Sequence, residues 1–427
     1  MTAPKTDKPI SRKNILRLAA LWAVLLPGLR TVPVQEKIIA IRAGRIQTVS
    51  QGEVEKGVIL VRDGLITEIG AQVAVPPDAE VWDFADKFIM PGIVSPDSNL
   101  GVYVRPERAT ELFFRPVEPQ GKNLAYYPVL FSIYPESPDY SLALKNGFTT
   151  LAISPPPAGI SGLGAVIRPE GQSLKDILVK DKAFLKVNVY VHTPFWNMLK
   201  EALEGAQKTI DDGKKKAEET AKKEKEKKRE KDKGKVEEKE EEPTISETTR
   251  VFMEVVAGKI PILAECDGPD AVLHIAELLA SYPQVKWSVR GGPAVFRAGQ
   301  LLKEKNIPVI LEPLFGVKAG FLTPYPERTN TVLKCQALDL KIALQAAGNI
   351  EQQIHLLDSL NLLYQSGVKK DVLFKGVTLV PAQILGLDNL VGSLEKGRRA
   401  DLIVLKGDPL ENVPVIEKVI LGGKVVQ

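Results

Sequence analysis

Several acidic residues and one arginine stand at or just beyond the carboxyl ends of apolar β runs in this 427-residue chain: Asp97, Glu265, Asp267, Glu312 and Arg290. Carboxylate oxygens are ligands that Mg²⁺ or Ca²⁺ accept. An arginine fork can instead hold a carboxylate in an ion pair. Its fixed charge repels a nearby divalent ion by several kcal/mol at an effective dielectric constant of about 20. One alternative is therefore an oxygen-ligand metal site. The other is an ion-pair network between Arg290 and one or more of three acids, Asp97, Asp267 and Glu312.

Histidine and cysteine are too scarce for the commonest metal sites. The chain has three histidines, His192, His274 and His355, so a site of four imidazoles cannot be assembled. His274 and His355 fall within helical patterns and His192 follows a β run; we expect all three to be structural or surface residues. Two cysteines, Cys266 and Cys335, are too few for a disulfide framework, although one pair could form in an oxidising compartment. We expect Cys266 to be a buried, inert thiol.

Short β runs and helical patterns alternate along most of the chain. Runs at both ends, from residue 37 onward and again in ADLIVLKGDP (400–409) and KVILGGKVVQ (418–427), predict one small β domain built from both termini. Between them the clearest strands are TTLAIS (149–154), LKVNVY (185–190), IPILAEC (260–266), VKWSVR (285–290), IPVILEP (307–313) and KIALQAA (341–347). Helical patterns follow several of these strands. The sequence therefore predicts an α/β fold, a (β/α)8 TIM-like barrel plus a small β-sandwich domain, with chemistry at the carboxyl ends of the barrel strands.

Four segments resemble the amidohydrolase superfamily, near its imidazolonepropionase-like members. They are DKFIMPGIVSPDSNLG (86–101), NGFTTLAISPPPAGISGLGAVI (146–167), GKIPILAECDGPDAVLHIAEL (258–278) and LVPAQILGLDNLVGSLEKGRRADLIVLKGDPL (379–410), of which the last is the most specific. Within this resemblance we interpret GISGLG (159–164) as a turn segment, since no Lys-Ser/Thr pair follows to make it a phosphate loop. The domains expected are a signal-like segment at 1–34, a β domain at 35–88 and 388–427, and the barrel at 89–387.

The resemblance also implies a mechanism, for which this chain has the wrong residues. In such enzymes one or two divalent metals, usually Zn²⁺, activate water to hydrolyse a carbon–nitrogen bond other than a peptide bond, and an aspartate moves the proton. The usual ligands are HxH on the first strand, a carboxylated lysine or its substitute midway, and single histidines on the fifth and sixth strands. We treat nine positions of this chain as a degenerate active site: Ser95, Asp97, Asn99, Glu265, Asp267, Arg290, Glu312, Gln345 and Ala347. Asp97 and Asn99 occupy the positions of the two HxH histidines. Asp267 and Arg290 occupy those of the single histidines, and Ala347 occupies that of the aspartate. We expect no catalytic residue, metal ligand or cofactor here.

The first 34 residues resemble an export signal. A basic start is followed by the apolar run LAALWAVLLPGL (18–29), which is shorter than the roughly 20 residues that span a bilayer. We expect a periplasmic or extracellular protein with no stable transmembrane span, although TVPVQ (31–35) is a poor cleavage site. The alternative is a buried amphipathic helix or an uncleaved anchor.

A charged insert, expected at about residues 205–248, interrupts the barrel. Its centre, DDGKKKAEETAKKEKEKKREKDKGKVEEKEEEP (211–243), has no apolar stripe and cannot join a core. Glu–Lys pairs four residues apart favour a solvated helix in places. We interpret the insert as a solvated loop insertion, with a docking arm as the alternative.

These observations predict an amidohydrolase-like protein that is catalytically inactive and acts as a binding or scaffold subunit. Its expected partner is an active amidohydrolase relative or a second copy of the chain. The net charge of +4 gives no ground for a nucleic-acid partner. The alternative function is an active metal-dependent hydrolase of a cyclic amide or related carbon–nitrogen bond that uses non-standard ligands.

Overall fold

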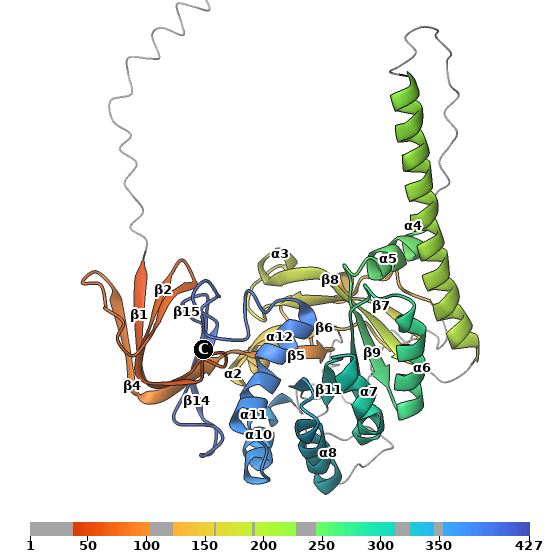
Figure 1. Ribbon diagram of the computed structural model, residues 1–427. Helices are drawn as coiled ribbons and strands as arrows, with labels where there is room; N and C mark the ends of the chain where they lie inside the picture. The colour runs from red at the N-terminus through yellow and green to blue at the C-terminus, as the bar shows by residue number, and fades with distance from the viewer. Residues whose placement is uncertain are drawn as a thin grey trace, which may run out of the picture. The chain divides into compact units, whose positions relative to one another are not determined.

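Residues from both ends of the chain form one seven-stranded sheet in the computed structural model (Figure 1). The structure describes residues 37–102, 123–157, 159–189, 193–227, 245–311, 325–345 and 353–427. In the order β15-β14-β13-β4-β1-β2-β3, the sheet contains β1 (Ile38–Gln47), β2 (Glu53–Arg62), β3 (Leu65–Gly70), β4 (Glu80–Pro91), β13 (Leu402–Leu405), β14 (Ile416–Leu421) and β15 (Lys424–Val425). The second sheet expected from both ends of the chain is therefore present, whereas its standing as a separate β domain and the expected domain boundaries stay predictions.

This sheet forms because its apolar residues alternate along the strands. Ile39 and Ile41 of β1 lie in a core with Ile59 of β2 and with Leu402 and Val404 of β13. Strand β4 is the link between the chain ends, since it pairs in parallel with β1 and antiparallel with β13. It then leads directly into the first strand of the second sheet.

The second sheet has eight strands in the order of the chain, as expected for a barrel. They are β5 (Ile93–Ser98), β6 (Phe148–Ile153), β7 (Ile160–Ile167), β8 (Leu178–Val189), β9 (Ile262–Cys266), β10 (Trp287–Gly291), β11 (Val309–Leu311) and β12 (Ile342–Leu344). Strands β8 to β12 run parallel, as do β5 and β6. The prediction of a TIM-like barrel is confirmed, with one difference in strand direction.

Strand β7 runs antiparallel to both of its neighbours. Its connections explain the direction, because a parallel crossover needs a dozen or more residues. The links 154–159 and 168–177 are both shorter than that. The interpretation of GISGLG (159–164) as a turn was therefore wrong: these residues are buried and open β7. Glycine is required at Gly164, because any side chain there would collide with the ring of Phe184.

Helices cover the outside of the barrel and close one of its ends. They are α2 (Pro138–Lys145), α3 (Leu174–Ile177), α4 (Thr193–Lys227), α5 (Glu247–Val256), α6 (Pro269–Ala280), α7 (Gly299–Glu304), α8 (Tyr325–Ala337), α10 (Leu356–Gln365), α11 (Lys370–Val377) and α12 (Leu379–Leu385), with 3-10 helices η1 (Val129–Ser132) and η2 (Pro293–Ala298). Helix α12 packs with the apolar residues inside the barrel through Val380, Ala382 and Leu385. Helix α12 therefore packs against the N-terminal end of the barrel.

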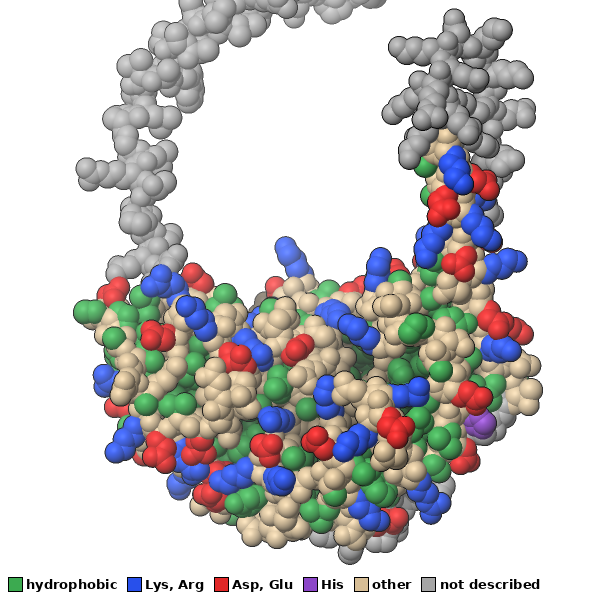
Figure 2. Space-filling view, in the orientation of Figure 1, with side chains coloured by type: hydrophobic (Ala, Val, Ile, Leu, Met, Phe, Trp, Pro, Cys, Tyr) green, Lys and Arg blue, Asp and Glu red, His purple; other side chains and the backbone are tan. Residues whose placement is uncertain are grey.

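Helix α4 carries the described part of the charged insert. Leu199, Leu203 and Ala206, in its first half, are buried. Farther along, Lys, Asp and Glu side chains cover the helix, which extends away from the strands (Figures 1 and 2). Residues 228–244 lie outside the described residues, as does the signal-like segment. Within the described part of the chain, no helix is both long and apolar enough to cross a membrane.

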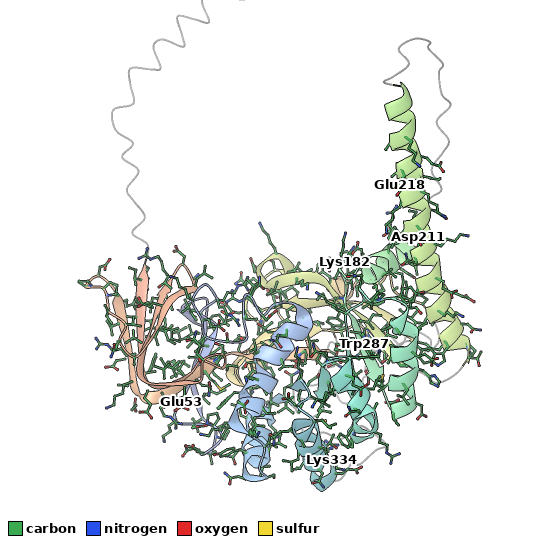
Figure 3. All side chains as sticks on the ribbon, viewed as in Figure 1. Glu53, Lys182, Asp211, Glu218, Trp287 and Lys334 are labelled. Carbon is green, nitrogen blue, oxygen red and sulfur yellow. The ribbon has the colours of Figure 1, made fainter. Side chains whose placement is uncertain are left out.

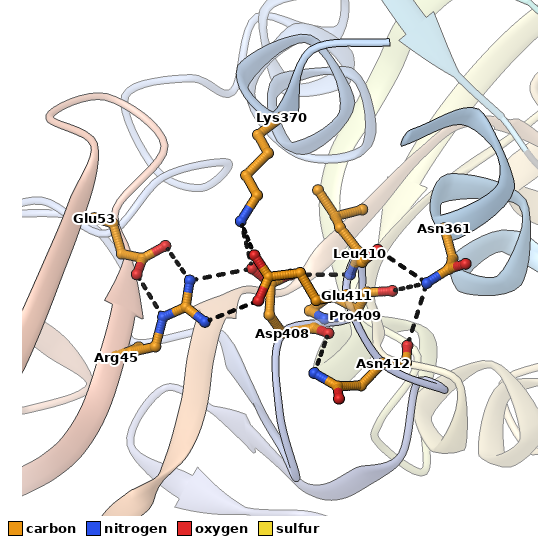
Figure 4. Close-up of polar contacts among 9 residues, drawn as sticks. All are labelled: Arg45, Glu53, Asn361, Lys370, Asp408, Pro409, Leu410, Glu411 and Asn412. Carbon is orange, nitrogen blue, oxygen red and sulfur yellow. Dashed lines mark hydrogen bonds and ion pairs between the residues drawn. The ribbon is translucent and has the colours of Figure 1, made fainter. Parts of the chain in front are cut away.

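A network of ion pairs links the seven-stranded sheet to the helices of the barrel (Figure 4). Asp408, whose side chain is buried, accepts from Arg45 Nη2 of β1 at 3.3 Å and from Lys370 Nζ of α11 at 2.9 Å. Lys370 also contacts Glu411 at 2.6 Å, and Arg45 is held by Glu53. One buried carboxylate therefore connects a strand from the N-terminal region with a late helix.

We predict that Asp408→Asn lowers the free energy of unfolding by about 1.5–3 kcal/mol, because two charge-assisted hydrogen bonds lose their charge at a buried site. Urea unfolding followed by circular dichroism measures this. Asp371→Asn is the matched control: its ion pair with Lys375 is exposed, so the loss should stay below about 1 kcal/mol. Equal losses in the two variants would contradict a special role for Asp408.

Candidate functional site

The inside of the barrel consists of an apolar layer and, above it, a polar layer. The apolar layer contains Val94, Ala152, Val166, Phe184, Leu263, Ile310 and Ala343. Because side chains alternate along a strand, residues two positions farther on face the same interior. On β8, β9 and β10, and just after β12, those positions carry Lys186, Glu265, Arg290 and Gln345. The polar layer therefore lies at the carboxyl ends of the strands, where TIM barrels hold their active sites.

Two carboxylates and two cations meet in this polar layer. Asp97 Oδ2 lies 2.6 Å from Lys186 Nζ and 2.7 Å from Arg290 Nη1. Glu265 Oε2 lies 3.1 Å and 3.3 Å from the same two nitrogens. The register places Arg290 directly beside Glu265 on adjacent strands. Each acid thus contacts both cations, and the formal charges of the four groups balance. We call these four residues the ion network.

Asp97 is the centre of the ion network. Its side chain is only 4% exposed. Its other carboxylate oxygen, Oδ1, accepts from Ser154 Oγ, and its backbone carbonyl accepts from the side-chain amide of Gln345. Next to it, Gln353 Nε2 donates to Ser98 Oγ at 3.2 Å. Groups from β5, β6, β8, β10 and β12 are therefore fixed around one carboxylate.

The electrostatics of Asp97 reflect a competition between burial and positive charge. Burial raises the pKa of a carboxyl group, but the charges of Lys186 and Arg290 outweigh that effect, so the Asp97 pKa lies below its ordinary value. The carboxylate is therefore ionised at neutral pH, and so its interactions with the cations are at full strength.

The predicted pairing of Arg290 with Asp97 is confirmed, whereas the other expected partners differ. Asp267 is exposed, just beyond the end of β9. The acid that contacts Arg290 is instead Glu265, because residues 263 and 265 share the inward face and residue 267 follows the strand. Glu312 lies outside the described residues, as does Ala347. The expected pairing of Asp267 with Arg290 was therefore wrong, whereas the alignment of Asp267 with a ligand histidine of the family stays a prediction.

The remaining predicted positions that the structure describes form no ion pair in the ion network. Ser95 is buried in β5, and within the described residues its hydroxyl has no hydrogen-bond partner. Asn99 is half-buried and lies in the turn after the strand. Gln345 contributes through its amide, which holds the backbone of Asp97.

The histidines and cysteines of the described chain lie outside the ion network. His274, exposed on α6, contacts the ring of Trp196, and His355 lies near Asp358 at the start of α10. Both cysteines are buried and free, and burial raises the pKa of each thiol to about 12. A thiol with that pKa stays protonated and is a poor nucleophile. His192 lies outside the described residues.

Lys186 is the residue that the sequence-based search missed. It is 3% exposed, although lysine is almost never fully buried without a partner. The signal lay in LKVNVY (185–190), where Lys186 and Asn188 alternate with apolar residues and must share one face. In a barrel strand with both faces buried, that face is the interior.

A divalent metal, which the family resemblance implies, does not fit the described residues. Both carboxylates of the ion network are already neutralised by Lys186 and Arg290. In the part of the chain that the structure describes, no three His, Cys, Asp or Glu residues are grouped to hold a metal ion. A bound divalent ion would also lie within reach of two fixed positive charges.

The amidohydrolase family model matches residues 342–426, from β12 to near the end of the chain. The structure of an amidohydrolase from Thermotoga maritima MSB8 resembles this one with a TM-score of 0.74, at 23% identity over 91% of this chain and 99% of that chain. The protein has the amidohydrolase fold. The resemblance to the superfamily is thereby confirmed, and membership of the imidazolonepropionase-like subgroup stays a prediction.

Other solved structures are similar at lower identity. Molinate hydrolase matches with a TM-score of 0.55 at 14% identity, covering 92% of this chain and 95% of that one. The ochratoxinase of A. niger matches with a TM-score of 0.53 at 14% identity, covering 91% and 95%. These likenesses concern the fold alone.

One curated protein matches a short segment of the sequence. It is a 5-methylthioadenosine/S-adenosylhomocysteine deaminase from Saccharophagus degradans, 44% identical over 48 residues. The match spans 11% of this chain and 11% of that protein. The sequence similarity therefore covers too little of either chain to carry over an activity.

We predict that Asp97→Asn lowers the free energy of unfolding by about 3–5 kcal/mol at neutral pH, because it leaves two buried cations without their carboxylate. Asp267→Asn, on an exposed side chain, should cost less than about 0.5 kcal/mol. Denaturant unfolding of the three proteins measures both values.

The cost of Asp97→Asn should shrink in acid. A carboxylate with a depressed pKa stabilises the fold above its unfolded pKa of about 3.9 and loses that contribution as the pH falls toward the folded value. The difference between wild type and Asp97→Asn should therefore narrow below about pH 4. A difference that is constant down to pH 3 would contradict the depressed pKa.

Proposed function

We propose that this protein is a non-hydrolytic protein with the amidohydrolase fold that acts as a binding or scaffold subunit. The observation that carries the proposal is the ion network. It occupies the end of the barrel where hydrolytic chemistry would take place, and its four charges satisfy one another. Metal-assisted hydrolysis needs carboxylate oxygens available for the metal and a site for water beside it.

The states of Asp97, Arg290 and the neighbouring Gln345 support this proposal. Asp97 is ionised and accepts hydrogen bonds on both oxygens, so neither oxygen is available as a general base or ligand. Arg290 cannot give up a proton at physiological pH. Gln345, which holds the Asp97 backbone, has an amide that does not titrate. A proton shuttle therefore lacks a donor and an acceptor among these residues.

The scaffold role follows from what the chain retains. The two sheets, their connection through β4 and the ionic link between them surround a centre whose carboxylates are paired with cations. Fold alone does not establish function, but a stable fold without its chemistry suits a structural partner. We propose export to the periplasm or outside the cell, and an active amidohydrolase or a second copy of this chain as the partner.

We predict that the purified protein, dialysed against Zn²⁺ and then Mn²⁺ and freed of excess ions, contains close to no metal by elemental analysis. Two cations at the barrel end exclude a third. Asp97→Ala and Glu265→Ala are measured in parallel, with Asp267→Ala as the exposed control. Metal at about one per chain in wild type and Asp267→Ala, lost in the other two variants, would overturn the proposal and establish a metal site with unusual ligands.

The scaffold part of the proposal has a separate test. Where a neighbouring gene encodes an amidohydrolase that retains HxH, the two chains are co-expressed and their complex is measured by sedimentation, together with this chain alone. A defined complex with the relative, or a stable homo-oligomer, supports the proposal. A monomer that remains alone in the presence of the relative contradicts it.

A further inference from the structure

A cavity of about 580 Å³ lies at the N-terminal end of the barrel, opposite the ion network. Its lining comes from the segments that lead into β9, β10, β11 and β12, and from the end of α12. TIM barrels place their active sites at the other end, so this cavity is not a remnant of the ancestral catalytic centre. Its volume falls in the range of small-molecule sites.

A lysine precedes each of the four strands whose starts line the cavity. They are Lys259, Lys286, Lys305 and Lys341. Backbone hydrogen bonds of 2.9 Å, from Ile262 N to the carbonyl of Lys286 and from Val309 N to the carbonyl of Lys341, fix the strand starts side by side. Because the strands are parallel neighbours, their lysines gather at one edge. All four side chains are exposed.

A fifth lysine, Lys180 of β8, lies deeper in the lining. It is half-buried, and its Nζ donates to the backbone carbonyl of Leu385 at the end of α12, at 2.8 Å. Burial, and then the positive charge of Lys286, hold the pKa of Lys180 below its ordinary value. The positive charges at the strand starts therefore lie close enough together for Lys286 to lower the pKa of Lys180.

Little negative charge compensates these lysines. Asp388 is the one acidic residue of the described lining. Among the described residues, none of the five lysines forms an ion pair with a carboxylate, in contrast to the cations of the ion network. Concentrated, uncompensated charge in a concave site attracts anions.

The cavity also has an apolar side. Trp287, the first residue of β10 and labelled in Figure 3, is half-buried in the lining, near Val380 and Ile384 of α12. An indole ring offers a flat surface for packing against a planar group. The described lining contains lysines and no arginine, which suits several point charges on phosphate groups better than one planar carboxylate.

We propose that this cavity binds a small phosphate ester that carries at least two phosphate groups and a flat portion, the chemistry of a nucleoside diphosphate or triphosphate. The lysines at the strand starts contact the phosphates, and Trp287 packs against the flat portion. The inference does not depend on the proposed function, because it concerns the opposite end of the barrel.

The test is isothermal titration of the full chain with ATP, with inorganic tripolyphosphate and with adenosine, each without metal. We expect one ATP per chain, weaker binding of tripolyphosphate and no measurable binding of adenosine. Raising the salt concentration from about 0.05 M to about 0.3 M should weaken ATP binding several-fold, because the contacts are exposed charges. Trp287→Ala should reduce the ATP affinity to that of tripolyphosphate.

Charge variants locate the site. The triple substitution Lys286→Gln/Lys305→Gln/Lys341→Gln should weaken ATP binding at least about tenfold, which corresponds to about 1.4 kcal/mol. The control Lys145→Gln/Lys418→Gln/Lys424→Gln removes the same charge from exposed lysines outside the cavity and should change the affinity less than twofold. All six side chains are exposed, so both variants should fold, which thermal unfolding verifies.

Three results would overturn the proposal. The first is no saturable binding of ATP or tripolyphosphate. The second is an equal loss of affinity in the two triple variants, which would indicate general electrostatic attraction. The third is equal affinity for ATP and tripolyphosphate in wild type, which would show that Trp287 and the apolar side contribute nothing.

Discussion

The buried carboxylate of Asp97 is the constraint around which the barrel end is arranged. A carboxylate that loses its water must be compensated by opposite charge and hydrogen bonds. Lys186 and Arg290 supply the charge, and Ser154 donates a hydrogen bond to the carboxylate. The Gln345 amide donates to the backbone carbonyl of the same residue. The sheet order begins at β12 and ends at β5, so the Gln345 amide bridges the two outermost strands through the Asp97 carbonyl. Asp97 is therefore held through its backbone as well as through its carboxylate, and the backbone contact links the two edges of the sheet.

The barrel separates its two charged regions by an apolar layer. Phe184, Leu263 and Ile310 lie between the ion network and the lysine-lined cavity, and α12 adds Val380 and Leu385 from below. The two regions also differ in how their positive charges are balanced. The cations of the ion network are paired with carboxylates, whereas the described cavity lysines form no ion pair with a carboxylate. The ion network is thus an internal structural unit, whereas the cavity presents its charge to solutes.

The sequence predicts the two sheets and the pairing of Arg290 with Asp97, because strand periodicity and the position of each strand end determine both. It placed the second acid at Asp267 instead of Glu265, since the inward face depends on the exact register of β9. Lys186 was missed because the search was directed at acids and histidines, although its alternation with Leu185 and Val187 marks it as an interior residue. The direction of β7 depends on connection lengths that are defined only once the strand ends are known.

The stretch PGIVSPDSNLG (91–101) contains glycines that the packing of the fold requires. A side chain at Gly92 would collide with Thr149, and Gly101 has a φ of 71° and no space beside Tyr140. Packing therefore demands these glycines whether or not a metal is bound. Between them, the Asp97 carboxylate lies among the charged side chains inside the barrel, where a buried charge must be balanced by an opposite one. A metal satisfies that demand with neutral imidazoles and acids, whereas Lys186 and Arg290 satisfy it here with the charge of the chain itself. The glycines of the motif thus indicate the fold. Inferences about the chemistry must come from the charged residues inside the barrel.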